Sequence, residues 1–119
     1  MYYNRQGDQI NVLEWGKLFE DKSYQVIKQN YVGDYFVSTV WVGLSYSFEL
    51  PADIFETMIF KSHEDVLNYQ ERYNTEEDAL RGHDIACNFV RETILAEKAG
   101  IQKAEKVKDS QSQAILPSE

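Results

Sequence analysis

Two residues that could hold a metal lie four positions apart in the last third of the sequence. His83 and Cys87 would face the same way on a helix and could supply half of a tetrahedral zinc site. The remaining ligands would have to come from elsewhere, and His63 is the only other histidine. Both residues also belong to an apolar stripe, where cysteine and histidine are commonly buried. We therefore favour core packing over metal binding, and we expect no cofactor.

Glu56 is a carboxylate within the otherwise apolar run 54–60. If the carboxylate were desolvated there, its pKa would rise and would suit acid–base chemistry. Arg72, on the next predicted strand, is an obvious counter-ion and would lower that pKa instead. We favour a structural ion pair, which contributes less than ~1 kcal/mol to stability when it is partly exposed.

Other patterns that support catalysis are weak or missing. The run His63, Glu64 and Asp65 is polar enough for a cation, but it is more typical of a turn followed by a short cap. The sequence contains no phosphate-binding loop, no dinucleotide-binding glycine pattern, no Cys-x-x-Cys pair and no nucleophile elbow. An enzyme remains an open alternative, but no motif supports one and we expect no catalytic residues.

The elements that must position these residues form an α+β pattern. A short hairpin opens the chain, and Asn11 is a suitable N-cap for a helix that runs to about Glu20. Strands are predicted at 24–32, 35–44, 54–60 and 68–73, with a loop at 45–53. The expected fold is an antiparallel three- to four-stranded meander sheet, with the short N-terminal helix and a long C-terminal helix packed on one face.

The last helix begins with a strong start signal. Thr75 is the predicted N-cap, and three acids in the first turn complement the helix dipole. Gly100 either ends this helix or only weakens it. An apolar stripe runs along one side, and its later part is predicted to project beyond the sheet from about residue 96. Its members are Leu80, His83, Cys87, Val90, Ile94, Ile101 and Ala104.

Composition limits the functional class. The 119 residues carry 20 acids and 12 bases, for a net charge of −8, which argues against a general nucleic-acid binder. One cysteine excludes an intramolecular disulfide and points to a reducing compartment. The sequence shows no apolar run of membrane-spanning length and no signal-peptide pattern. We expect a cytoplasmic protein with one domain at 1–108 and a disordered tail at 109–119.

Acidic and aromatic side chains gather in the middle of the chain. Residues 49–78 hold nine acids and two bases, nearly the whole net charge. Aromatic residues surround the end of the second strand and the loop after it, and such rings are common interface anchors. The candidate interaction residues are Trp41, Tyr46, Phe48, Glu49, Asp53, Glu56, His63, Glu64 and Asp65.

Several segments resemble a family of small uncharacterised proteins of phages and prophages. The resemblance covers roughly residues 1–90 and rests on 15–21 (WGKLFED), 38–44 (STVWVGL), 54–60 (IFETMIF) and 72–83 (RYNTEEDALRGH). It implies a phage accessory product and no particular activity. Members often have Asp-His where this chain has Ser45 and Tyr46, so a catalytic or metal-binding pair at that place would be absent here.

These observations lead to two functional hypotheses and one on assembly. The first is an acidic accessory protein that binds and modulates or inhibits a host protein, for example a defence component, in the bacterial cytoplasm. The alternative is a small-molecule, nucleotide-type binding or sequestering protein. For assembly, the projecting stripe predicts a homodimer through Val90, Ile94 and Ile101.

Overall fold

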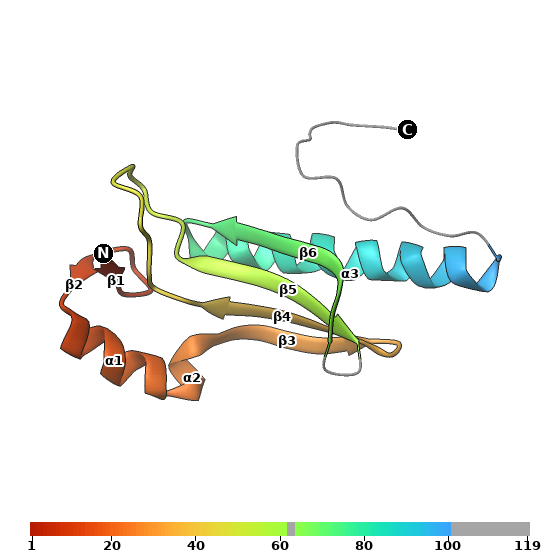
Figure 1. Cartoon of the computed structure of the whole chain (residues 1–119), viewed down its shortest axis with the longest axis horizontal. Helices are drawn as coiled ribbons and strands as arrows, with labels where there is room; N and C mark the ends of the chain where they lie inside the picture. Colours follow the sequence, from red (N-terminus) through yellow and green to blue (C-terminus); the bar gives the residue numbers. More distant parts are fainter. Residues whose placement is uncertain (62–63, 101–119) are drawn as a thin grey trace.

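The protein is an α+β structure, as the sequence predicts. The computed structural model describes the backbone of residues 1–61 and 64–100, and the side chains of 1–61 and 68–100. The described residues form a two-stranded hairpin, a four-stranded sheet, two short helices and one long helix, arranged as in Figure 1. The elements are β1 (Tyr2–Tyr3), β2 (Gln9–Ile10), α1 (Val12–Glu20), α2 (Lys22–Gln25), β3 (Val26–Val32), β4 (Tyr35–Trp41), β5 (Phe55–Lys61), β6 (Glu64–Tyr73) and α3 (Glu76–Lys98).

The main sheet is an antiparallel meander in the order β3-β4-β5-β6. Gly33 turns the chain between β3 and β4 with a φ of 59°, a conformation that glycine adopts without strain. Register places Thr39 opposite Thr57 and Val40 opposite Glu56. Side chains alternate between the two faces of a strand, so one face of β4 carries Tyr35, Val37, Thr39 and Trp41. All four are buried.

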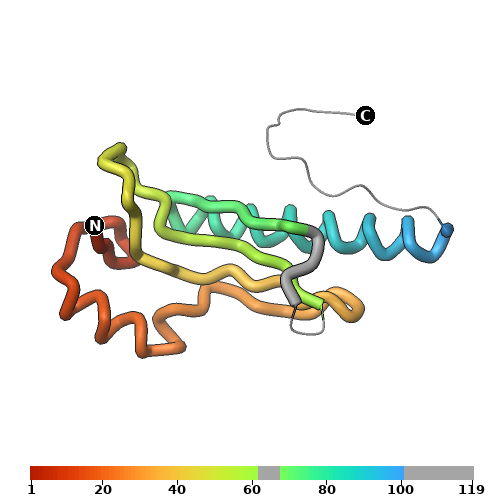
Figure 2. Tube along the Cα trace, in the orientation of Figure 1, coloured from red at the N-terminus to blue at the C-terminus, as the bar shows by residue number. Residues whose placement is uncertain are grey.

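The long helix α3 covers that face of the sheet (Figure 2). Thr75 caps it as predicted, because the Thr75 side chain accepts a hydrogen bond from the Asp78 amide. After the helix, Gly100 has a φ of 75°, the left-handed conformation that ends many helices. The core under α3 is formed by Tyr35, Val37, Ile59, Tyr69, Ala86, Cys87 and Val90.

The structure corrects the proposed dimer surface at Val90 and Ile94, which both pack within the same chain. Val90 has no exposed surface, and Ile94 packs against the core over the β3–β4 turn. A Cβ added at Gly33 would lie 2.8 Å from Ile94 Cδ1. One turn further along α3, Glu97 Oε2 accepts a 2.8 Å hydrogen bond from the Tyr35 hydroxyl, while the end of the helix extends beyond the strands (Figure 1). The third proposed dimer residue, Ile101, lies outside the described residues, as does the tail.

A second core cluster lies at the opposite end of the sheet. Trp41, Ile54 and Phe55 form its centre, and residues of α1 pack against them from one side. Asn11 caps α1 as predicted, since its side chain accepts from the Glu14 amide. Figure 1 places α1 and the N-terminal hairpin beside this end of β4, close to the start of the β4–β5 loop. In the described part of the chain, no helix is both long and apolar enough to span a membrane.

Candidate functional site

The loop between β4 and β5 is held firmly at its base. The Val42 and Gly43 amides both donate to the Ile54 carbonyl, at 2.8 and 3.1 Å, and the Ile54 amide donates to the Tyr73 carbonyl at 2.9 Å. These bonds tie the two ends of the loop to each other and to β6. Figure 1 shows the loop extending past the end of the sheet.

Three large side chains on this loop point away from the protein. Tyr46, Phe48 and Leu50 are 88%, 85% and 75% exposed. The Ser47 amide donates to Ser45 Oγ, and the Glu49 amide donates to Ser47 Oγ, so local hydrogen bonds shape the backbone between them. Single exposed apolar residues are ordinary, but three in one short loop form a patch of the kind that marks an interface.

An apolar hollow lies at the base of the loop. It has a volume of about 300 Å³, and its walls come from α1, the loop and β6. The Trp15 indole donates a 3.0 Å hydrogen bond to the Val42 carbonyl and stacks on Phe19, with 4.8 Å between ring centroids. The lining residues are Trp15, Phe19, Val42, Leu44, Tyr46 and Arg72. Tyr46 thus joins the exposed patch to this hollow.

A polar hollow lies on the other side of Tyr46. It has a volume of about 290 Å³ and contains two carboxylates and one guanidinium. Arg72 lines both hollows, and its Nη2 donates to the Leu44 carbonyl at 3.4 Å. The residues that line the polar hollow are Ser45, Tyr46, Ser47, Glu49, Pro51, Asp53 and Arg72.

The predicted pair of Glu56 and Arg72 is confirmed. The two residues are register partners on β5 and β6, and Arg72 Nε lies 3.9 Å from Glu56 Oε2. The Gln70 amide also donates to Glu56 Oε2. Because Arg72 is 37% exposed, the ion pair contributes well under ~1 kcal/mol to stability. The carboxylate is a structural group of the sheet face opposite α3.

That sheet face also carries apolar side chains farther from the loop. Among the described elements, no helix lies across it, and Phe36, Met58 and Phe60 are only half-buried. Tyr31 is 70% exposed and lies with its ring centroid 5.0 Å from that of Phe36. Tyr31, Phe36 and Phe60 thus lie toward the β3–β4 turn, and the Glu56–Arg72 pair lies between them and the apolar hollow.

The structure places Trp41 in the core, which corrects its assignment to the interaction surface. Trp41 has no exposed surface, and its indole donates a 3.2 Å hydrogen bond to the Tyr3 carbonyl. Its ring packs edge-on against Tyr24 and lies directly against Gly43. The cause is strand alternation, because Trp41 follows Val37 and Thr39 on the buried face of β4.

The other expected acids divide between two ends of the sheet. Glu49 and Asp53 are exposed near the loop, and Glu56 lies just behind it. The backbones of Glu64 and Asp65 pair with Lys61 and Phe60 at the far end of β5, a strand of seven residues. Since such a strand covers about 20 Å, these acids do not form one surface.

The start of β6 corrects the prediction of a turn and a short cap at residues 63–65. Glu64 and Asp65 begin β6 instead of forming a cap, so this strand starts four residues before the predicted Asn68. His63 lies outside the described residues.

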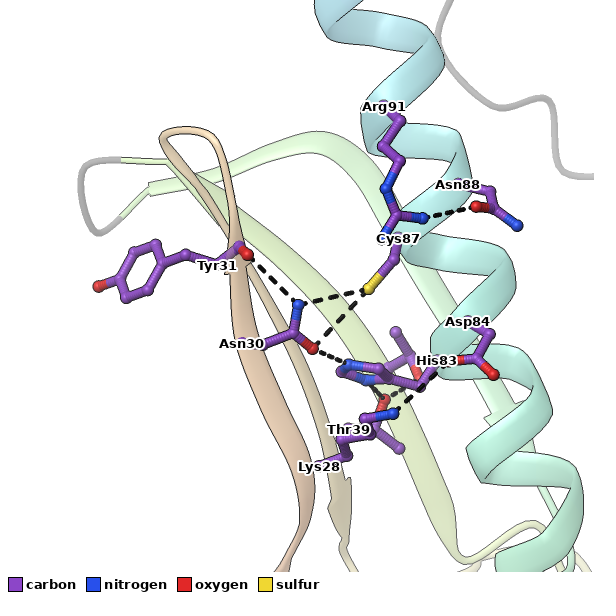
Figure 3. A network of polar contacts seen from close by, with 10 residues as sticks. Lys28, Asn30, Tyr31, Thr39, His83, Asp84, Cys87, Asn88 and Arg91 are labelled. Carbon is purple, nitrogen blue, oxygen red and sulfur yellow. Dashed lines mark hydrogen bonds and ion pairs between the residues drawn. The ribbon is translucent and has the colours of Figure 1, made fainter.

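His83 and Cys87 belong to a buried polar network between α3 and the sheet (Figure 3). His83 has no exposed surface; its Nδ1 lies 2.7 Å from Thr39 Oγ1 and its Nε2 lies 2.5 Å from Asn30 Oδ1. Thr39 Oγ1 is in turn 2.5 Å from Thr57 Oγ1. Because Asn30 Oδ1 only accepts, Nε2 carries the imidazole proton and Nδ1 accepts from Thr39.

The surroundings of His83 favour the neutral form of its ring. Burial is the main reason that its pKa is lowered from the ordinary value of 6.5, and the Lys28 charge adds to the effect. Asn30 Nδ2 lies 3.6 Å from Cys87 Sγ, which is 4% exposed. The preference for core packing over zinc is consistent with this arrangement. Among the described residues, no three His, Cys, Asp or Glu side chains are grouped so as to hold a metal.

Comparison with known proteins does not narrow the function, because no protein-family model, curated protein or solved structure matches this chain.

Proposed function

We propose that this chain is a small acidic accessory protein that binds a host protein inside the bacterial cell and modulates or inhibits it. In this proposal the 45–53 loop makes the central contact. The observation that carries it is the exposure of Tyr46, Phe48 and Leu50 on a loop whose base is fixed. Aromatic side chains on such loops are frequent sources of binding energy.

The fixed base supports the proposal on energetic grounds. A loop that is already ordered loses less conformational freedom on binding than a mobile one. The hydrogen bonds of Ile54 and the Trp15 contact with Val42 hold the two ends of this loop before any partner arrives. The apolar hollow beside Tyr46 then offers a place for one side chain of the partner.

The charges near the loop indicate the chemistry of the partner. Glu49 and Asp53 are exposed there, and the whole chain carries −8. A partner surface with an apolar pocket, bordered by Lys or Arg side chains, would complement both features. Since exposed charges are screened by salt, association should be faster at low ionic strength.

The test is affinity capture from host lysate with three forms of the full chain. The wild type should retain a saturable partner, and the double variant Tyr46→Ser/Phe48→Ser should retain at least tenfold less, since losing two interface anchors costs about 2 kcal/mol or more each. Leu13→Ser is the matched control, because Leu13 is 77% exposed but lies on α1. Equal recovery with all three forms would reject the proposal.

A further inference from the structure

A polar groove separates α3 from the edge strand β3. It has a volume of about 450 Å³ and lies on the side of the buried network that faces the solvent. Two cations, two amides, one carboxylate and the thiol line it. These residues are Lys28, Asn30, Asp84, Cys87, Asn88 and Arg91.

Arg91 is held in the groove by an uncharged group. Its Nη1 donates to Asn88 Oδ1 at 2.6 Å, and Figure 3 shows the side chain running back along α3 toward Cys87. Within the described part of the chain, Arg91 forms no ion pair with a carboxylate. In a sequence with 20 acids and 12 bases, a guanidinium without a carboxylate partner is available for an external anion.

Lys28 supplies a second cation across the groove. Its ammonium lies 3.6 Å from Asp84 Oδ1, and the two side chains are 50% and 71% exposed. Such a pair contributes little to stability, so an incoming anion can replace Asp84 as the partner of Lys28 at small cost.

The floor between the two cations is formed by side chains that already have hydrogen-bond partners. Asn30 accepts from His83 Nε2 and donates to the Tyr31 carbonyl at 3.3 Å, while Cys87 is almost fully buried beside it. Fixed polar groups need no reordering when a ligand binds, which favours affinity for a small molecule.

We propose that this groove binds a small molecule through its phosphate or carboxylate groups, with Lys28 at one end of the groove and Arg91 at the other. This site is separate from the 45–53 loop and does not depend on the proposed protein partner. Guanidinium and ammonium groups are the side chains that recognise both kinds of oxyanion.

The test follows the side-chain amide NMR signals of Asn30 and Asn88 in the full chain. Inorganic phosphate and succinate are added in separate titrations up to about 10 mM, above the Kd of a millimolar site. We expect saturable shifts at both amides with at least one probe, and the stronger of the two titrations identifies the preferred oxyanion. Cys87 is the only cysteine, so slower alkylation at saturation gives an independent readout.

Variants separate this site from general charge attraction. Lys28→Gln/Arg91→Gln should weaken binding about tenfold or more, since charge-assisted hydrogen bonds are lost, and Arg91→Lys should retain part of it. Arg81→Gln is the matched control, because Arg81 is on the same helix but pairs with Glu77 and Asp78. The proposal is overturned if neither probe gives a saturable shift, or if the double variant and the control bind equally.

Discussion

Replacing Trp41 with alanine should lower the free energy of unfolding by about 3–5 kcal/mol, a large part of the ~5–15 kcal/mol of a typical domain. The indole has no exposed surface and packs against Tyr24 and Gly43. Its removal leaves a cavity at the centre of the second core cluster and deprives the Tyr3 carbonyl of its donor. Urea unfolding followed by circular dichroism measures the difference.

Two further variants make this result specific. Trp41→Phe keeps most of the ring volume and should cost less than the alanine variant. Leu13→Ala, at a site that is 77% exposed, should stay within about 0.5 kcal/mol of the wild type. If Trp41→Ala unfolded like the wild type but lost partner binding, Trp41 would be an interface anchor and its placement in the core would be wrong.

Replacing His83 with leucine should cost about 2–5 kcal/mol at neutral pH. The variant leaves the Thr39 hydroxyl and Asn30 Oδ1 without their shared partner in a buried place, and each lost partner costs about 1–3 kcal/mol. Replacing His83 with glutamine should cost less, because the amide also offers one acceptor and one donor.

The wild type should also lose stability as the pH falls from about 7.5 to about 5.5. Burial is the main cause that lowers the pKa of His83 in the folded state from its ordinary value of 6.5. Below pH 6.5 the unfolded chain therefore binds more protons than the folded chain. Protonated Nδ1 would no longer accept from Thr39. The stability contributed by neutral His83 is therefore present above pH 6.5 and decreases as the pH falls toward the folded pKa.

The glutamine variant is the control for this pH effect. Its side chain does not titrate, so the difference in unfolding free energy between the two proteins should shrink as the pH falls. All other ionisable groups are the same in the two proteins, so their contributions cancel in the comparison. A difference that stays constant from about pH 7.5 to about pH 5.5 would show that the His83 ring is not held neutral by the fold.

Local sequence signals were sufficient for most of the framework. The caps at Asn11 and Thr75, the order of the meander and the pairing of Glu56 with Arg72 all follow from spacing and residue type, and the structure confirms them. These features depend on neighbours in sequence or on adjacent strands, where register follows alternation.

The apolar stripe predicted most of the buried face of α3, because His83, Cys87 and Val90 are buried, but it did not predict every position. The periodic pattern selected Leu80, which is 39% exposed, whereas Ala79 and Gly82 are buried. A Cβ at Gly82 would overlap the Tyr73 ring, so the helix turns its small residues toward the large aromatic side chains of the sheet. Packing of small side chains against large ones explains why Ala79 and Gly82 face the sheet. A hydrophobicity pattern does not contain that information.

The candidate sites were predicted in part. Exposure of Tyr46 and Phe48 followed from their place in a loop, but the hollow beside Tyr46 depends on Trp15 and Arg72, which meet only in the folded chain. The groove likewise depends on the folded chain, because its lining residues Lys28 and Arg91 come from β3 and α3. The residues of each site are far apart in the sequence, so no local motif predicts that they line the same hollow or groove.

The central claim is that the 45–53 loop contacts a host protein, and site-specific photo-crosslinking in host cells tests it most directly. A photoactivatable benzoylphenylalanine is placed at position 48 in one form of the chain and at position 13 in another, two sites that are both strongly exposed. We expect a crosslinked product with a host protein from position 48 and none from position 13. Crosslinks from position 13 alone, or crosslinks from position 48 only to a second copy of this chain, would contradict the account.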